Sequence, residues 1–384
     1  MLAESYHSSL VEQIKADDFA FRAGRLTVHL AREFGFCYGV DRAVDYAYQT
    51  RERFPDRRVF LTGEIIHNPH VNDKLRAMGI QFIGHDEHAV EGLGKDDVVI
   101  LPAFGVTVGV LQGLDKRGCT LIDTTCGSVL NVWKNVRRYA EGGYTSLIHG
   151  KVWHEETQAT ASQAVTYGGR YLVVLDRHEA ARVCDVIRRP AVGGDDPDRA
   201  AFVERFGGAA SVGFEPQRDL QRIGLANQTT MLMSESLEIG EMLKAAMTER
   251  YGAAKIESHF QAFDTICSAT QDRQDAVVAL LREQAVDLMI VIGGYNSSNT
   301  CNLARICAAS RPTFHIADPD CLVSAAHIRH RPVGSKTEVA ADAWLPPDGP
   351  VTIGLTSGAS TPDNLVGAVV AKLSEFARPT APPG

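Results

Sequence analysis

The chain has 384 residues, of which 45% are hydrophobic, with a formal net charge of −8 and a pI near 5.9. At roughly 150 residues per domain, this length predicts two or three domains. The acidic balance argues against a general nucleic-acid-binding protein, which would present a basic face. The sequence has no run of about 18 apolar residues, so no membrane span is predicted. Its acidic start is unlike a transit or secretory signal. We therefore expect a cytoplasmic protein.

Short β-rich runs alternate with amphipathic runs along almost the whole chain, which is typical of α/β proteins with mostly parallel sheets. Strands are predicted at 57–63, 97–103, 120–125, 145–150, 171–175, 287–294, 313–318 and 351–358. Helices are predicted at 39–54, 68–79, 127–143, 154–164, 271–284, 299–310 and 361–377. Residues 190–222 are rich in Gly, Pro and charge and indicate an insertion or a linker between units. The tail, 377–384, is expected to be disordered.

One short phrase occurs twice, as Asp-Thr-Thr-Cys at 123–126 and Asp-Thr-Ile-Cys at 264–267. Cys37 shares the position between an extended run and a helix, without the Asp-Thr. At such turns, unpaired N–H groups and the helix dipole favour a thiolate, which is the form that binds a metal. We interpret the Asp and the first Thr of the repeat as residues that fix the turn.

Three cysteines at equivalent turns predict one shared metal centre with Cys37, Cys126 and Cys267 as ligands. Iron–sulfur clusters that carry electrons use four cysteines, and structural zinc sites are also closed by four ligands. A three-thiolate cluster leaves one iron open, which indicates a catalyst. The alternative is three unrelated buried thiols, since free cysteines are often buried. The other five cysteines lack this turn context and are expected to be structural.

Two loops at predicted helix starts carry hydroxyl and amide side chains, one at 296–299 and one at 357–361. Such helix starts bind anions, phosphate especially, although simple N-capping would require the same residue types. His67 and His154 lie at equivalent turns and would complement phosphate charge when protonated. The sequence HEETQ is not a zinc-protease motif, because Gln158 replaces the second histidine. The sequence has no dinucleotide-binding or phosphate-loop motif. If the protein is a reductase, its electrons would therefore come from a partner protein.

Eight short motifs, taken together and in order, resemble the 4-hydroxy-3-methylbut-2-enyl diphosphate reductase family over residues 34–372. The sequence around His154 resembles the longer branch of that family. The motifs are GFCYGVDRAV, GEIIHNP, IDTTCGSV, HEETQATAS, NQTTM, DTICSATQDRQDA, GGYNSSNT and SGASTPDNLV.

The resemblance implies three pseudo-equivalent α/β units around a central [4Fe–4S] cluster, held by Cys37, Cys126 and Cys267 with one open iron. It implies a two-electron reductive dehydroxylation of an allylic diphosphate to isopentenyl and dimethylallyl diphosphates, the last step of the methylerythritol phosphate pathway of isoprene biosynthesis. The electron donor would be a protein such as ferredoxin or flavodoxin. Glu156 matches the family's proton-donating carboxylate, and Thr229 matches the threonine near the substrate hydroxyl group. The positions matching diphosphate-binding residues are His67, His154, Ser297, Ser298, Asn299 and Ser360.

The units are expected at 26–126, at 127–266 with the insertion, and at 267–376, after an N-terminal extension of 25 residues. Phe104 departs from the pattern, because many members have a histidine there that would contact the diphosphate. Two other classes of protein stay open. A quinolinate-synthase-like dehydratase would need carboxylate-binding residues instead of the anion loops, and an iron–sulfur sensor would more naturally carry a nucleic-acid-binding segment.

Overall fold

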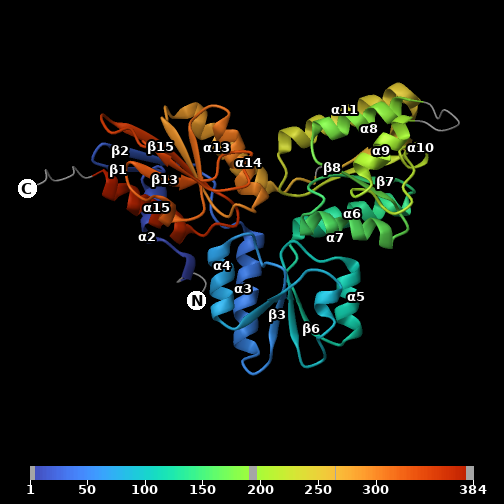
Figure 1. Ribbon diagram of the computed structural model, residues 1–384, viewed down its shortest axis with the longest axis horizontal. Coiled ribbons are helices and arrows are strands. Elements are labelled where there is room, and N and C mark those ends of the chain that lie inside the picture. Colours follow the sequence, from blue (N-terminus) through green and yellow to red (C-terminus); the bar gives the residue numbers. More distant parts are fainter. Residues whose placement is uncertain (1–4, 190–196, 264, 378–384) are drawn as a thin grey trace, which may run out of the picture. The chain divides into compact units, whose positions relative to one another are not determined.

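The computed structural model describes residues 5–189, 197–263 and 265–377, and the chain forms two compact units within it (Figure 1). Unit 1 consists of residues 1–48, 66–77 and 268–384, and unit 2 consists of 49–65 and 78–267. From residue 378 on, the tail for which we expect disorder lies outside the described residues. Across the described part of the chain, none of the helices has the length and apolar run needed to cross a membrane.

A five-stranded sheet forms the centre of unit 1. Its strand order is β1-β2-β15-β11-β12, with β1 antiparallel to β2 and all other neighbours parallel. The strands are β1 (Ala20–Ala23), β2 (Leu26–Leu30), β11 (Leu288–Ile292), β12 (Thr313–Ile316) and β15 (Val351–Ser357). A separate antiparallel hairpin joins β13 (His327–His330) to β14 (Val339–Asp342). The second strand of the chain therefore pairs with its last.

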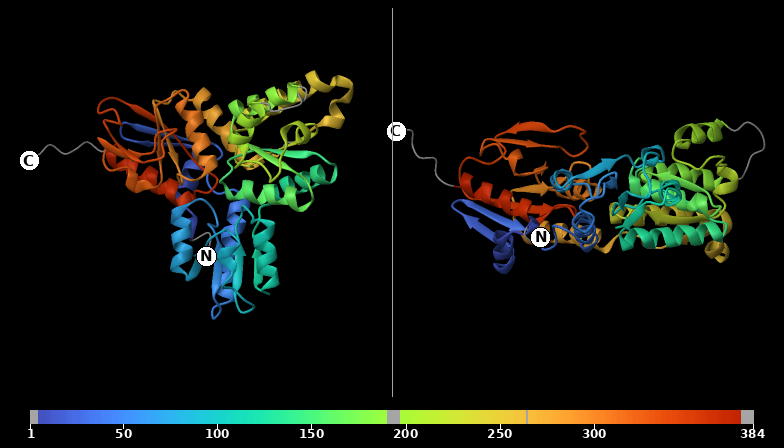
Figure 2. Two further views of the ribbon diagram at one scale, coloured as in Figure 1. Left: turned by 45° about the vertical axis from the view of Figure 1, so that its right-hand side comes forward. Right: turned by 90° about the horizontal axis from the view of Figure 1, so that it is seen from below.

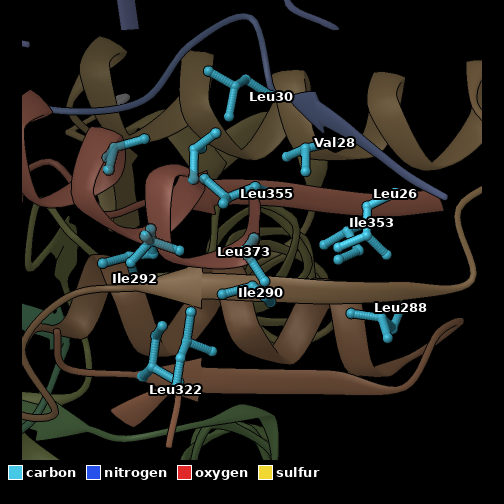
Figure 3. Packing of buried hydrophobic residues seen from close by; sticks show 14 of the residues in the cluster. Leu26, Val28, Leu30, Leu288, Ile290, Ile292, Leu322, Ile353, Leu355 and Leu373 are labelled. Carbon is cyan, nitrogen blue, oxygen red and sulfur yellow. The ribbon is translucent and has the colours of Figure 1, made fainter. Parts of the chain in front are cut away.

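Helices cover both faces of this sheet, because the central strands are apolar on both sides. On one face, Leu288, Ile290 and Ile292 pack in a cluster with residues of α2 (Ser9–Ala16) and α15 (Asp363–Phe376), part of which is shown in Figure 3. On the other face, Met289 and Val291 pack against α13 (Ser268–Glu283) and α14 (Ser298–Ala308). Alternation along one strand thus places successive side chains in two different cores.

Unit 2 contains two four-stranded sheets in which every neighbouring pair is parallel. The first has the order β4-β3-β5-β6 and the second β10-β9-β7-β8. The strands are β3 (Val59–Thr62), β4 (Ile80–Ile83), β5 (Val98–Leu101), β6 (Thr120–Asp123), β7 (Thr145–His149), β8 (Tyr171–Val174), β9 (Ile223–Asn227) and β10 (Phe260–Ala262). Crossover helices join parallel strands, as this topology requires.

The remaining elements are helical. They are α3 (Tyr38–Arg53), α4 (Pro69–Ala77), α5 (Val108–Lys116), α6 (Gly127–Glu141), α7 (Glu155–Thr166), α8 (Arg177–Arg188), α9 (Pro197–Phe206), α10 (Pro216–Asp219), α11 (Met233–Tyr251) and α12 (Ile256–His259), with short 3₁₀ turns at His88–Val90, Ala253–Lys255 and Pro319–Cys321. Figure 2 shows α8 and α11 side by side, and ion pairs between Arg188 and Glu249 and between Arg177 and Glu238 join them.

The predicted α/β class with mostly parallel sheets is confirmed. Residues 190–222 fall within unit 2, and Phe202 and Phe206 of α9 are buried in a core of that unit, so the described part is not a linker between units. The alternative, an insertion in this unit, stays a prediction. Sequence patterns missed β1, β2, β4, β9, β10 and the β13–β14 hairpin. In the expected N-terminal extension, β1 is the edge strand of the unit 1 sheet and α2 packs on that sheet. The boundaries expected for three α/β units stay a prediction.

Candidate active site

Each of the three candidate ligand cysteines directly precedes a helix. Cys37 is followed by α3, Cys126 is the N-cap residue of α6 with extended backbone angles (φ −66°, ψ 142°), and Cys267 is followed by α13. The strand-to-helix turns predicted around these cysteines are therefore present. A helix N-terminus stabilises negative charge, such as that of a metal-bound sulfur.

The three cysteine turns also share a hydrogen bond. The backbone N–H of Cys37 donates to the carbonyl of Ala359 (3.2 Å), that of Cys126 to Ala103 (3.0 Å), and that of Cys267 to Thr229 (3.2 Å). In each case the acceptor lies in the loop after the strand that pairs in parallel with the cysteine's own strand, β15, β5 and β9 in turn. The three turns are thus built on one plan.

The first threonine of the repeated phrase fixes its turn in both copies. Thr124 Oγ1 donates to the carbonyl of Leu101, the last residue of β5, at 2.6 Å. Thr265 Oγ1 accepts from the backbone N–H of Asn227, the last residue of β9, at 2.8 Å. Both threonines therefore tie the cysteine turn to the end of the neighbouring strand, which confirms the structural role expected for this residue. Asp264 lies outside the described residues.

The donor set suits a bound cluster. The thiols of Cys37, Cys126 and Cys267 are partly exposed, as are those of Cys119 and Cys301, whereas Cys184, Cys307 and Cys321 are buried. Within unit 2, Ser128, two residues after Cys126, donates from Oγ to Cys267 Sγ at 3.4 Å, so the two turns of the repeat meet. Three partly exposed thiols at helix starts fit thiolate ligands better than core residues, which are usually buried.

The predicted site residues fall in two sets. Unit 1 holds Cys37, His67, Ser297, Ser298, Asn299 and Ser360, and unit 2 holds Cys126, His154, Glu156, Thr229 and Cys267. In unit 1, the loop that follows β11 and the loop that follows β15 both reach His67. Asn296 Nδ2 lies 3.4 Å from His67 Nδ1, and Ser360 Oγ donates to the His67 carbonyl at 3.2 Å. A third bond joins the two loops, from the Ala359 N–H to Asn299 Oδ1 at 2.9 Å.

Two glycines allow this close approach. Gly293 has a φ of +145°, a backbone conformation that side chains rarely adopt. At Gly294, a Cβ atom would overlap the carbonyl oxygen of His67. The loop can therefore lie against His67 only with glycine at these positions.

The start of α14 presents the hydroxyl and amide groups of this loop. Ser297 is the N-cap, and its Oγ accepts from the Thr300 N–H at 3.3 Å and from Thr300 Oγ1 at 3.0 Å. Ser298 and Asn299 occupy the first helical positions and are buried. The bonds from Thr300 to Ser297 are ordinary N-capping, which was the alternative to anion binding for this loop. The N–H and hydroxyl groups gathered at this helix start are nevertheless of the kind that suits an anion.

In unit 2, Glu156 and Thr229 form a buried pair. The backbone N–H of Thr229 donates to Glu156 Oε1 at 2.6 Å, and Thr229 Oγ1 donates to Glu156 Oε2 at 3.0 Å. Glu156 is only 1% exposed and Thr229 only 5%. One residue thus contacts both oxygens of the carboxyl group, and its hydroxyl is positioned to pass on a proton.

His154 caps α7 and has Phe104 beside it. Its Nδ1 accepts from the Glu156 N–H at 3.2 Å, so the proton of the neutral ring lies on Nε2. The Phe104 ring meets the His154 ring edge-on, with centroids 5.4 Å apart and an interplanar angle of 82°. Phe104, which departs from the family pattern in the sequence, therefore forms an aromatic wall that helps to orient His154.

Sequence reasoning missed two buried polar residues of the site. Gln228 Oε1 accepts from the Lys151 N–H at 3.0 Å and from Thr157 Oγ1 at 3.2 Å, joining the loops after β7 and β9. Arg273, 4% exposed, reaches from α13 to the carbonyl of Gly35 at 2.9 Å and so supports the turn of Cys37. The only sequence signal was their place in NQTTM and in the helix after Cys267.

Known proteins resemble this chain over nearly its whole length. The family model described as LytB protein matches residues 28–374. A curated 4-hydroxy-3-methylbut-2-enyl diphosphate reductase of Gloeobacter violaceus is 50% identical over 98% of this chain and 89% of its own length. A second, of Thermosynechococcus vestitus, is 48% identical over 97% of this chain and 90% of its own.

Two solved structures share the fold. One is titled as (E)-4-hydroxy-3-methyl-but-2-enyl diphosphate reductase, the terminal enzyme of the non-mevalonate pathway, with a TM-score of 0.55 and 25% identity over 91% of this chain and 99% of that one. The other is the E-1-hydroxy-2-methyl-but-2-enyl-4-diphosphate reductase from Plasmodium falciparum, with a TM-score of 0.66 and 21% identity over 92% and 88% of the two chains. The chain belongs to the LytB family.

Proposed function

We propose that this protein is a 4-hydroxy-3-methylbut-2-enyl diphosphate reductase, which forms isopentenyl and dimethylallyl diphosphates in the last step of the methylerythritol phosphate pathway. The substrate gains two electrons and two protons and loses its hydroxyl group as water. The observation that carries the proposal is the common plan of the cysteine turns, each bonded through its N–H to a neighbouring loop. Two of those loops carry Ser360 and Thr229, which we assign to the substrate.

Membership of the LytB family implies an iron–sulfur cluster, and we assign it as one [4Fe–4S] cluster with Cys37, Cys126 and Cys267 as ligands. When bound, such a cluster supplies electrons and one iron that no cysteine occupies, open to the substrate hydroxyl group. Ser128 would donate its hydroxyl hydrogen to the Cys267 sulfur, as it does at 3.4 Å in the structure. Hydrogen bonds to the sulfur atoms are one of the means by which a protein adjusts a cluster's potential.

We assign the diphosphate to His67, to His154 and to the loops that follow β11 and β15. Ser297, Ser298, Asn299 and Ser360 offer donors suited to phosphate oxygens. Because His154 Nδ1 accepts from the Glu156 N–H, the proton of the neutral ring lies on Nε2, which would be the atom that donates to a phosphate oxygen.

Glu156 and Thr229 are proposed to deliver protons. A proton on Glu156 would pass to the leaving hydroxyl group through the Thr229 hydroxyl, which lies 3.0 Å from the carboxylate. Because the pair is buried, the proton would not be lost to bulk water, and loss of the hydroxyl group as water is easier than loss as hydroxide.

We propose a ferredoxin- or flavodoxin-like protein as the electron donor, because the sequence lacks a dinucleotide-binding motif. We also propose a cytoplasmic location, because the eight cysteines, all within the described residues, form no disulfide bonds. The function is tested by incubating anaerobically purified, iron-loaded protein with the allylic diphosphate and a chemical reductant. We expect both isoprenoid diphosphates as products, and a protein that holds the cluster but forms neither product would contradict the proposal.

A further inference from the structure

We propose that the β13–β14 hairpin holds the anion loop, defined as residues 293–299, in its binding conformation through Tyr295, which acts as a positioning residue. The inference deepens the proposed function, because it concerns the diphosphate site assigned above. All the contacts that carry it lie within unit 1.

The hydroxyl group of Tyr295 connects the loop to the hairpin. Tyr295 Oη donates to Glu338 Oε2 at 2.7 Å, and Glu338 directly precedes β14. The other carboxylate oxygen of Glu338 accepts from Arg329 Nη1, on β13, at 2.9 Å. Glu338 is therefore fixed by the opposite strand of its own hairpin and presents one oxygen to Tyr295. A hydrogen bond to a charged acceptor is stronger than one between neutral groups.

The ring of Tyr295 is enclosed by two further side chains. His315, at the end of β12, meets it edge-on with the centroids 5.0 Å apart, and the guanidinium of Arg331, just after β13, lies 5.0 Å from its centre. His315 Nε2 also lies 2.9 Å from the carbonyl oxygen of Gly293, to which it can only donate. The same buried histidine thus holds the first residue of the loop and the ring of the third.

The backbone of Tyr295 is held as well. The Cys301 thiol donates to the Tyr295 carbonyl at 3.4 Å, and Arg331 Nη2 donates to Cys301 Sγ at 2.7 Å. Two residues of the hairpin, Glu338 and Arg331, therefore act on Tyr295 by separate routes. The residues that follow, Asn296 and Ser297, contact His67 and cap α14. The position of Tyr295 accordingly sets where the donors of the loop point.

This arrangement predicts an effect on substrate binding and not on the chemical step. The diphosphate is bound equally in the ground state and the transition state, so loosening its donors should raise KM and leave kcat unchanged. Tyr295 itself needs no contact with the substrate for this effect.

The test is a double-mutant cycle with Tyr295→Phe and Glu338→Ala, assayed with a chemical reductant. Each single variant should raise KM about tenfold with kcat within about twofold of the wild type, the loss expected for a hydrogen bond to a charged group. Because both changes remove the same contact, the double variant should be no worse than the worse single variant.

Two further variants separate positioning from general damage. Glu338→Gln keeps an oxygen that can accept from Tyr295 and should restore most of the wild-type KM. Asp342→Ala is the matched control, since Asp342 is on the same hairpin but pairs with exposed His327 at its surface. It should behave as the wild type. Additive effects of Tyr295→Phe and Glu338→Ala, or a change in kcat with unchanged KM, would overturn the inference.

Binding of inorganic pyrophosphate, measured by calorimetry on the cluster-loaded full chain, gives a readout that does not need turnover. Tyr295→Phe should weaken it about tenfold. Equal affinity of Tyr295→Phe and the wild type would overturn the inference even if the protein is an active reductase. A wild type that forms neither product would instead contradict the proposed function, and the pyrophosphate comparison would still decide the role of Tyr295.

Discussion

Thr229 makes two different connections at once: its carbonyl accepts from the Cys267 N–H at 3.2 Å, and its hydroxyl donates to Glu156 Oε2 at 3.0 Å. A candidate ligand and the candidate proton donor are thereby tied to the same residue of the loop after β9. This coupling explains why a threonine is suited to the position, because valine would keep the first bond and lose the second.

Changing Glu156 to Gln should lower kcat by about 100-fold or more, because it removes a general acid, while pyrophosphate binding should change little. The measurement is steady-state turnover with a chemical reductant, alongside calorimetry. Glu155→Gln is the control, since Glu155 is the adjacent residue and carries the same charge, whereas both bonds to Thr229 are to Glu156. Equal turnover of Glu156→Gln and the wild type would refute the role.

Changing Cys126 to Ser should abolish retention of the cluster, because a neutral hydroxyl is a poor substitute for a thiolate ligand. The check is iron and sulfide content with the visible absorbance of protein purified without oxygen. Cys184→Ser is the matched control, since that thiol is buried in the core of unit 2. If both variants held the same iron, Cys126 would not be a ligand.

Changing Gly294 to Ala should displace the anion loop, because the added Cβ would overlap the His67 carbonyl oxygen. We expect weaker pyrophosphate binding by at least about tenfold, which corresponds to about 1.4 kcal/mol. Gly92→Ala provides the comparison, because a Cβ there meets nothing within 4 Å. Unchanged binding in Gly294→Ala would show that the loop tolerates movement at this point.

Stability should fall on mild acidification. Burial lowers the pKa of His149 to about 4, and burial likewise lowers that of His315 to about 4. Below the unfolded value of about 6.5, the unfolded chain binds protons that the folded chain does not, so each histidine should cost about 1 kcal/mol between pH 7 and pH 5.5. The contribution of these neutral buried histidines to the free energy of unfolding is fully present above pH 6.5 and declines towards pH 4.

Urea unfolding at the two pH values measures this effect. Replacing His315 by Phe should remove its share of the pH dependence, whereas replacing the exposed His178 should leave the dependence intact. A pH dependence that is the same in all three proteins would contradict the assignment.

The sequence was informative wherever a signal is local. β6, Cys126 and the start of α6 follow one another within a few residues, so this turn could be predicted locally, and the repeated phrase extended the prediction to Cys267. The pairing of β2 with β15 could not, because no short pattern encodes a partner more than 300 residues away. Arg273 resembles any surface arginine until the fold places it on the Gly35 carbonyl. The contact between Tyr295 and Glu338 is also invisible in sequence, since 43 residues separate them.

The parallel pairing of β2 with β15 also has a consequence for synthesis of the protein. The Gly35 N–H, beside Cys37, donates to the hydroxyl of Ser357, 322 residues later, so the Cys37 turn gains this bond and the one to Ala359 only after residues 357–359 have been translated. Residues 78–267 are contiguous and carry the other two cysteines, so they can fold earlier. Of the three candidate ligands, Cys37 is therefore translated before the other two but reaches its final conformation after them.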